Sequence, residues 1–273
     1  MWFADLDSPT GARCGSGEVF GCTIVMTAKD GLVLVGNNED RNNTETIVTF
    51  VPASEKYYGR ILFGYKDAPF QGGMNDQGLF IDGNAVAPTG WKLNPEKETF
   101  SWSVMMSVLA TCATREDVKT FFDQYNISAL ERARFPVADR SGASMIVEFG
   151  QGDVQFVERK GWYQIATNFI ISNINGHQYP CWRYRRADRM LSEAEHLTLE
   201  LIRNVLDSTH QEERSLTVYS NIYDLKEGKI YLYNLRNFEE VVTLNLREEL
   251  QRGERQIDLS TLFGRADTNK SSD

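Results

Sequence analysis

The sequence predicts an α+β protein in which mainly antiparallel sheets pack between helical layers. Short apolar runs joined by Gly-containing turns open the chain, and the hydrophobic period changes to that of helices near residue 101. The order of strands, helices, strands, helices and strands then fills the rest of the chain. Hairpin spacings outnumber those of a β-α-β crossover, which favours antiparallel pairing.

The clearest local signal is a hairpin at the start of the folded body. Two apolar runs, 22–27 and 32–37, flank an Ala-Lys-Asp-Gly segment that is typical of a tight turn. Leu32–Val35 is apolar at every position, so we expect this strand to be covered on both faces. Further strands are expected at 47–51, 61–63, 79–81, 144–149, 154–158, 162–168, 216–224, 229–235 and 240–244.

Helical spacing begins near residue 101. Trp102, Met105, Met106 and Leu109 recur at i, i+3, i+4 and i+7, which predicts a helix whose apolar stripe packs into the core. Further helices are expected from Thr114, where Asp117 completes a capping pattern, around 182–194, around 198–206 and near 247–252.

Composition favours one large domain that acts on a small molecule. The 273 residues are 41% hydrophobic and 11% aromatic, which is enough for a substantial core. We expect a leader at 1–21, a single domain at 22–264 and a polar tail at 265–273. The formal net charge of -9, without a long basic run, argues against binding to nucleic acid or anionic membranes. Assembly into a homo-oligomer is compatible with the sequence.

No residue pattern indicates a metal or another cofactor. The four cysteines form no Cys-x-x-Cys pair and the three histidines show no ligand spacing, so we expect neither. No apolar stretch approaches the ~18 residues that would span a bilayer, and the polar start lacks the order of a signal peptide. As written, the chain is expected to be cytoplasmic. If a signal peptide has been removed, it would be secreted or periplasmic.

Cys22 is the first candidate for chemistry. If the chain is cut between Gly21 and Cys22, one residue supplies both a thiol nucleophile and an α-amine. Asp40 ends the Gly-Asn-Asn-Glu-Asp run at 36–40 and returns across the hairpin, where it could hold that amine in place. Taken alone, an inert buried cysteine and an aspartate that caps a turn explain these two residues better.

Two asparagines and an arginine are further candidates. Asn84 lies just past an apolar strand, after a Gly-rich run at 71–78 that turn chemistry mostly explains. Asn168 ends another strand, where its amide could donate to an oxyanion. Arg183 lies at the edge of an apolar helical stripe and needs a partner, either in a structural ion pair or in a functional site.

Together these segments resemble one family, the choloylglycine hydrolase, penicillin V acylase and isopenicillin-N acyltransferase group of N-terminal nucleophile hydrolases. The segments that stand in the family's order and approximate spacing are Cys22-Thr23, 36–40, 73–79, Thr167-Asn168 and the Arg183 helix. The resemblance covers roughly residues 20–253. It implies a four-layer αββα sandwich of two mainly antiparallel sheets, and hydrolysis or acyl transfer at a linear non-peptide amide.

The resemblance also implies roles for the candidate residues. Cys22 would attack the amide carbonyl through Sγ after autocatalytic cleavage of the bond before it, and water would resolve the thioester. Asp40 would orient the α-amine, and Asn84 and Asn168 would hydrogen-bond the oxyanion. Arg183 would support the site electrostatically. The alternative interpretation is a non-catalytic binding module on the same fold that holds a small amide or amino-acid-like ligand.

Position 37 departs from the family pattern. Bile-salt hydrolases and penicillin V acylases usually carry an arginine where this chain has Asn37, and that arginine helps to organise their active site. Its absence argues against a bile-salt or penicillin V substrate and favours the acyltransferase-like branch. The leader at 1–21 also differs from relatives whose cysteine directly follows the initiator Met.

Overall fold

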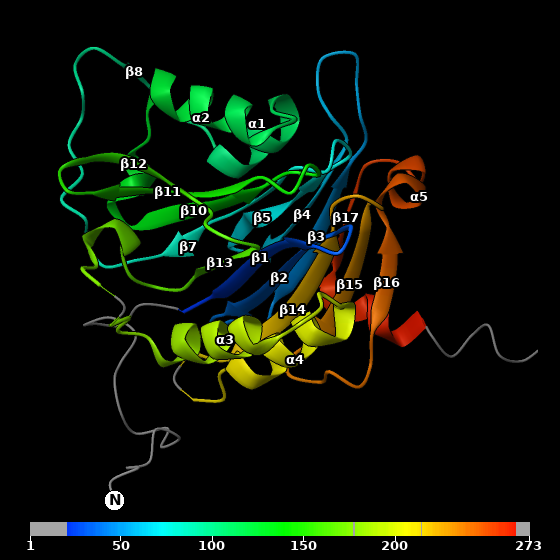
Figure 1. Ribbon diagram of the computed structural model, residues 1–273. Helices are drawn as coiled ribbons and strands as arrows, with labels where there is room; N and C mark the ends of the chain where they lie inside the picture. The colour runs from blue at the N-terminus through cyan, green and yellow to red at the C-terminus, as the bar shows by residue number, and fades with distance from the viewer. Residues whose placement is uncertain (1–20, 177, 214, 266–273) are drawn as a thin grey trace, which may run out of the picture.

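Two large antiparallel sheets face each other, and helices cover both outer faces (Figure 1). The structure is a computed structural model that describes residues 21–265 except 177 and 214. The predicted leader up to residue 20 and the predicted tail from residue 266 lie outside the described residues. The layers confirm the predicted α+β sandwich of helix, sheet, sheet and helix.

The first sheet places the start of the folded chain near its centre. Its strand order is β13 (Tyr163–Ala166), β1 (Thr23–Lys29), β2 (Leu32–Asp40), β14 (Thr217–Asp224), β15 (Lys229–Asn234) and β16 (Val242–Asn245). All neighbours are antiparallel. Asp30 and Gly31 have φ of 52° and 82°, the left-handed geometry that a tight hairpin turn requires, so the predicted β1–β2 hairpin is confirmed.

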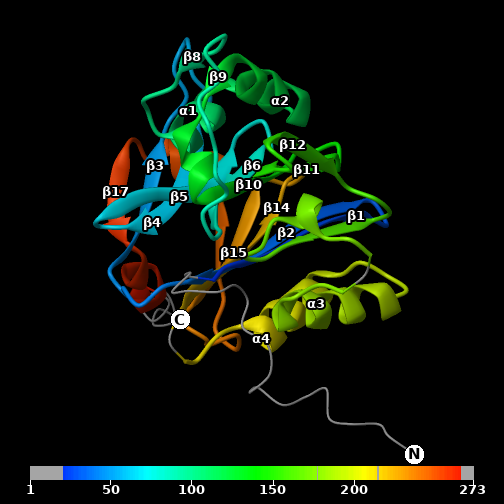
Figure 2. The same ribbon diagram turned by 90° about the vertical axis from the view of Figure 1, so that its left-hand side faces the viewer.

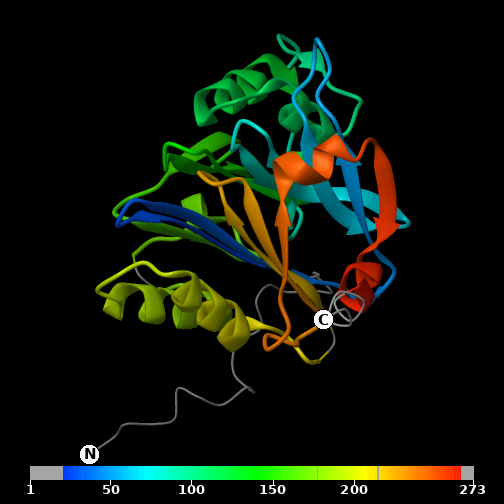
Figure 3. The same cartoon turned by 90° about the vertical axis from the view of Figure 1, so that its right-hand side faces the viewer.

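The second sheet includes four strands that the sequence did not reveal: β5, β7, β10 and β17. Its order is β12 (Asp153–Glu158), β11 (Ser144–Gly150), β10 (Ala133–Ala138), β6 (Phe80–Asp82), β5 (Ala68–Asn75), β4 (Arg60–Tyr65), β3 (Thr46–Val51) and β17 (Arg255–Asp258). The short β7 (Asn84–Ala85) pairs with β10, and β17 pairs with β3 near the end of the described chain (Figure 3). A separate parallel pair joins β8 (Glu98–Thr99) to β9 (Tyr125–Asn126).

Helices form the two outer layers (Figure 2). α1 (Val104–Thr111) contacts β5 and β6, and α2 (Arg115–Gln124) lies on the same side of the molecule. α3 (Trp182–Glu193) and α4 (Leu199–Thr209) contact β13, β2 and β14 of the first sheet. The remaining helical elements are α5 (Leu246–Gln251) and the 3-10 turns Ser128–Glu131, Ile171–Asn173 and Leu259–Arg265.

The starts of α1 and α2 show what local sequence can and cannot predict. The capping box between Thr114 and Asp117 is present, as predicted. Trp102, by contrast, lies outside α1 and is 80% exposed, so its place in the predicted stripe is wrong. Ser103 starts the helix instead, because its side chain accepts a hydrogen bond from the Met106 main-chain N–H.

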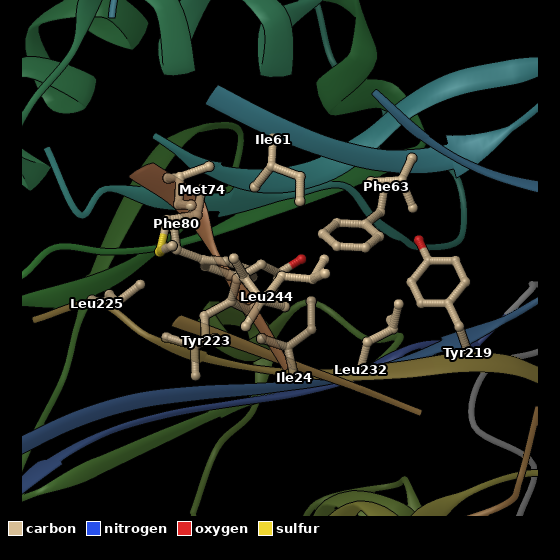
Figure 4. Packing of buried hydrophobic residues seen from close by; sticks show 14 of the residues in the cluster. Ile24, Ile61, Phe63, Met74, Phe80, Tyr219, Tyr223, Leu225, Leu232 and Leu244 are labelled. Carbon is tan, nitrogen blue, oxygen red and sulfur yellow. The ribbon is translucent and has the colours of Figure 1, made fainter. Parts of the chain in front are cut away.

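The space between the sheets is filled by apolar and aromatic side chains (Figure 4). Ile24 from the first sheet lies opposite Ile61 and Phe63 from the second. The ring centroid of Tyr223 lies 6.0 Å from that of Phe63 and 5.0 Å from that of Phe80. This packing fixes the two sheets against each other, and thereby the strand ends that carry the candidate residues.

Two glycines in β5 let its neighbours approach closely. A Cβ at Gly73 would lie 2.0 Å from the Ile61 carbonyl oxygen, and one at Gly72 would lie 2.0 Å from Asp82 Oδ2. The expectation that turns explain most of the Gly-rich run at 71–78 is therefore wrong for its first half, which is strand. Glycine is needed there because main chain and side chains from adjacent strands occupy the Cβ position.

Gly73→Ala should lower the unfolding free energy by about 2 kcal/mol or more, because the new methyl group overlaps main chain that cannot move away. Chemical denaturation measures the change. Gly264→Ala is the matched control, since a Cβ at Gly264 meets no atom within 4 Å. Equal midpoints for both variants would contradict the close packing of β4 on β5.

Candidate active site

The five candidate residues converge at one end of the first sheet. Their positions are Cys22 just before β1, Asp40 at the end of β2, Asn84 at the start of β7, Asn168 after β13 and Arg183 in the first turn of α3. All five are buried, with at most 4% of each exposed. Hydrogen bonds of Arg183 and Asn84 connect them. The fold thus brings together segments that are up to 161 residues apart in the chain.

Arg183 is the centre of the cluster. Its Nη1 lies 2.8 Å from the carbonyl oxygens of both Gly21 and Cys22, and 3.3 Å from Asp40 Oδ2. Its Nη2 donates to Asn168 Oδ1 at 2.7 Å. The partner that the sequence left open for Arg183 is therefore Asp40 together with the main chain on both sides of the Gly21–Cys22 bond.

Asp40 is held by donors from a second region of the chain. Its Oδ2 accepts from Gln211 Nε2 at 2.7 Å, and its Oδ1 accepts from the Thr217 hydroxyl. A bulge in β14 next to Thr217 changes the register at this point. Burial raises the pKa of Asp40 to about 7, against Arg183, Thr217 and Gln211, which lower it. Gln211 also donates to the Gly21 carbonyl oxygen at 3.0 Å.

Asn84 and Asn168 flank the main chain at Cys22. Asn84 Nδ2 lies 3.5 Å from the Cys22 carbonyl oxygen, and its Oδ1 accepts from Arg134 Nε at 3.0 Å. Arg134 in turn forms a fully buried ion pair with Glu148 at 3.3 Å. Asn168 Nδ2 donates to the Ala85 carbonyl oxygen at 2.7 Å. Both amides are thus oriented by bonds to neighbouring strands or to Arg183.

The thiol of Cys22 faces a carboxyl group that the sequence analysis did not single out. Cys22 Sγ donates to Glu39 Oε2 at 3.3 Å, and the Tyr65 hydroxyl donates to Glu39 Oε1 at 3.1 Å. Burial, followed by the charges of Glu39, Asp40 and Asp82, raises the pKa of Cys22 well above its ordinary value. A thiol in such surroundings becomes a nucleophile only after a base has removed its proton.

A second buried carboxyl lies beside Glu39. Asp82 Oδ2 accepts from Asn37 Nδ2 at 3.4 Å, while Asn37 Oδ1 and Asp82 Oδ1 have no hydrogen-bond partner among the described residues. Burial raises the pKa of both Glu39 and Asp82, and the charge of Glu39 raises that of Asp82 further. Asn37, unlike an arginine at the same position, adds no positive charge near these carboxyls.

Sequence reasoning missed four polar residues of the site for different reasons. Glu39 and Asp82 stand next to Asp40 and close to Asn84, the residues of those segments to which a role was assigned. Arg134 lies in an unpredicted strand, and Gln211 lies in the loop after α4 without any local motif. For Glu39, Asp82 and Arg134 a signal was available, because each is a charged residue at an inward position of a largely apolar strand.

Neither a metal centre nor a membrane helix occurs in the part of the chain that the structure describes. No three His, Cys, Asp or Glu side chains are grouped there so that they could hold a metal ion. No helix in the same part combines the length and the apolar character that crossing a bilayer requires.

The fold, two antiparallel sheets packed between helical layers, is shared with solved structures of a bile acid hydrolase and a penicillin V acylase. The chain is similar to a conjugated bile acid hydrolase from Clostridium perfringens, an arginine-to-leucine variant: TM-score 0.67, 17% identity, covering 86% of this chain and 95% of that one. A cysteine-to-alanine mutant of that hydrolase gives a TM-score of 0.65 at 17% identity, and the match covers 87% of this chain and 95% of that one. Penicillin V acylase from Agrobacterium tumefaciens gives a TM-score of 0.65 at 15% identity, and the match covers 86% of this chain and 90% of that one.

At these identities the similarity establishes the fold. No family model matches the sequence, and no curated protein matches it.

The buried carboxyls predict a stability that falls with rising pH. Burial raises the pKa of Glu39, Asp40 and Asp82 above the values of the unfolded chain, so the folded state binds more protons between about pH 4 and pH 7 and loses stability across that window. Asp82→Asn should therefore raise the unfolding free energy near about pH 8 and change it little near about pH 4.

Urea denaturation across this pH range measures the effect. The exposed Asp123→Asn is the matched control and should leave the pH slope unchanged. A slope in Asp82→Asn equal to that of the wild type would show that Asp82 does not contribute.

Proposed function

We propose that the chain is a cysteine-nucleophile amidohydrolase or acyltransferase that cleaves a linear non-peptide C–N amide through a thioester, after autocatalytic cleavage before Cys22. The observation that carries the proposal is the enclosed Gly21–Cys22 peptide, whose two carbonyl oxygens both accept from Arg183. The same guanidinium binds Asp40 and Asn168. The similar structures are named as a hydrolase and an acylase, which supports this reaction class.

The catalytic cycle starts with the α-amine that cleavage creates at Cys22. An α-amino group has an ordinary pKa of about 7.7–8.0, so it can accept the thiol proton near neutral pH. Cys22 Sγ then attacks the substrate carbonyl, and Asn84 and Asn168 hydrogen-bond the oxyanion. The α-ammonium protonates the departing amine, and Asp40 orients it. Water, or a second amine in acyl transfer, resolves the thioester.

The charges around the thiol restrict the substrate. The Glu39 carboxylate is buried beside Cys22, and Asn37 adds no positive charge. An anionic group placed next to the nucleophile would be repelled in this low-dielectric interior. The part of the substrate nearest to Cys22 is therefore neutral or cationic, which disfavours the bile-salt and penicillin V substrates already made doubtful by Asn37.

The first prediction of this proposal concerns the N-terminus. Purified wild-type protein should lack residues 1–21, whereas Cys22→Ala should keep them, because the variant has no thiol to attack the preceding carbonyl. Intact mass and N-terminal sequencing measure both. A wild-type protein that retains Met1 under conditions of full folding would contradict autocatalysis and favour the non-catalytic binding module.

The second prediction concerns turnover on a panel of neutral and cationic linear amides. Cys22→Ala should have none, and Asn168→Ala should lose roughly 10² to 10³ in kcat, about 2.7 to 4 kcal/mol, because one oxyanion donor is removed. The exposed Asn94→Ala serves as the matched control and should retain wild-type turnover. Equal turnover in Asn168→Ala would exclude its amide from the oxyanion site. Unchanged turnover in Arg183→Ala would exclude the electrostatic role of its guanidinium.

A further inference from the structure

We propose that Glu39 and Gln211 carry the self-cleavage step: Glu39 takes the proton of the Cys22 thiol, and Gln211 joins Arg183 in binding the oxyanion that forms on Gly21. This inference rests on the proposed function and assigns residues to its first reaction. Neither Glu39 nor Gln211 has a place in the catalytic cycle described above.

The carbonyl of Gly21 already lies between two donors. Its oxygen accepts from Arg183 Nη1 at 2.8 Å and from Gln211 Nε2 at 3.0 Å. When a nucleophile attacks this carbonyl, negative charge develops on that oxygen, so the hydrogen bonds from both donors become stronger in the transition state. Asp40 Oδ2, which accepts from both side chains, holds them in this orientation.

The close fit around Gly21 supports a dedicated site. A Cβ added at Gly21 would lie 2.6 Å from Arg183 Nη2 and 3.1 Å from Gln211 Nε2. Any other residue before the cleaved bond would push these donors away from the carbonyl. The absence of a Cβ at Gly21 therefore lets Arg183 and Gln211 stay at the carbonyl oxygen.

A base other than the α-amine is needed before cleavage. In the uncut chain the nitrogen of Cys22 is an amide, which does not accept a proton. Glu39 Oε2 lies 3.3 Å from Sγ, whereas the oxygens of Asp40 accept from Arg183, Gln211 and Thr217. Among the described residues, Glu39 is thus the carboxyl that hydrogen-bonds the thiol.

The two strands of the first hairpin and a bond from the second sheet aim Glu39. Thr23 pairs with Asn38 in the β1–β2 register, so the next position along brings Cys22 opposite Glu39 on the same face. The Tyr65 hydroxyl fixes the second carboxyl oxygen. Burial raises the pKa of Glu39, which makes its carboxylate a better proton acceptor than an exposed glutamate.

The step balances within the chain. The thiol proton moves to Glu39, and Sγ forms a bond to the Gly21 carbonyl carbon while the π electrons move to oxygen. The tetrahedral intermediate then breaks its bond to the Cys22 nitrogen, which takes the proton back from Glu39. Water hydrolyses the resulting thioester, which releases the leader with a Gly21 carboxylate and leaves Cys22 with a free amine and thiol.

The test uses the full-length chain, made by cell-free synthesis and sampled over time by intact mass. Glu39→Gln, which keeps size but cannot act as a base, and Gln211→Ala should each slow the loss of residues 1–21 by roughly 10²-fold. The exposed Glu227→Gln and Gln251→Ala are the matched controls and should be cleaved at the wild-type rate.

Hydroxylamine separates the two halves of the reaction, because it captures a thioester as a hydroxamate. It should speed leader release in the wild type and in both controls, but not in Glu39→Gln, where formation of the thioester limits the rate. Thermal unfolding confirms that each variant is folded. If Glu39→Gln does not fold, Glu39→Asp replaces it, and it should be cleaved more slowly than the wild type because its carboxyl is one methylene farther from Sγ.

The outcomes distinguish this inference from the proposal on which it rests. Cleavage of the wild type with control rates in folded Glu39 and Gln211 variants overturns the inference alone. No cleavage in the wild type overturns autocatalysis and this inference together. Slow variants beside normal controls, with no acceleration by hydroxylamine in the Glu39 variant, support it.

Discussion

The buried guanidinium of Arg183 is the constraint on which the rest of the structure depends. Taking a charged group out of water costs several kcal/mol unless hydrogen bonds and an opposite charge offset it. Here the carbonyls of Gly21 and Cys22, the carboxyl of Asp40 and the amide of Asn168 supply that compensation. These groups lie just before β1, at the end of β2 and just after β13, so α3 must pack against the first sheet in one position to satisfy its arginine.

The excess of acid over base is the second constraint. Glu39, Asp40 and Asp82 are all buried, and the buried guanidinium of Arg183 forms its ion pair with Asp40. The fold therefore makes these carboxyls harder to ionise than they are in water, and it loses stability as the pH rises. Buried acids with raised pKa values cost stability, and they are typical of sites where protons are transferred. This connects the three acids to the chemistry of the Cys22 thiol.

Local signals in the sequence predicted the elements that local physics determines. The Asp30–Gly31 turn and the capping box at Thr114 need only neighbouring residues, and both were predicted. β5 and β10 could not be recognised, because their glycines, proline and arginine are unfavourable in an isolated strand and become necessary only against adjacent strands. The five candidate residues could be found because each lies at or near one end of a strand or helix. Gln211 could not, since only the folded loop after α4 brings it to Gly21.

The two reactions proposed for Cys22, self-cleavage and turnover on a separate substrate, would place different demands on the same thiol. The Gly21 carbonyl is fixed next to its donors by the chain itself, so the first reaction needs no binding energy to bring the reactants together. If the leader leaves as proposed, Arg183 and Gln211 each lose an acceptor, and buried donors without partners are costly. A substrate that offers an oxygen at that point restores the lost hydrogen bonds. The groups that prepare the enzyme would then also contribute to the affinity for its substrate.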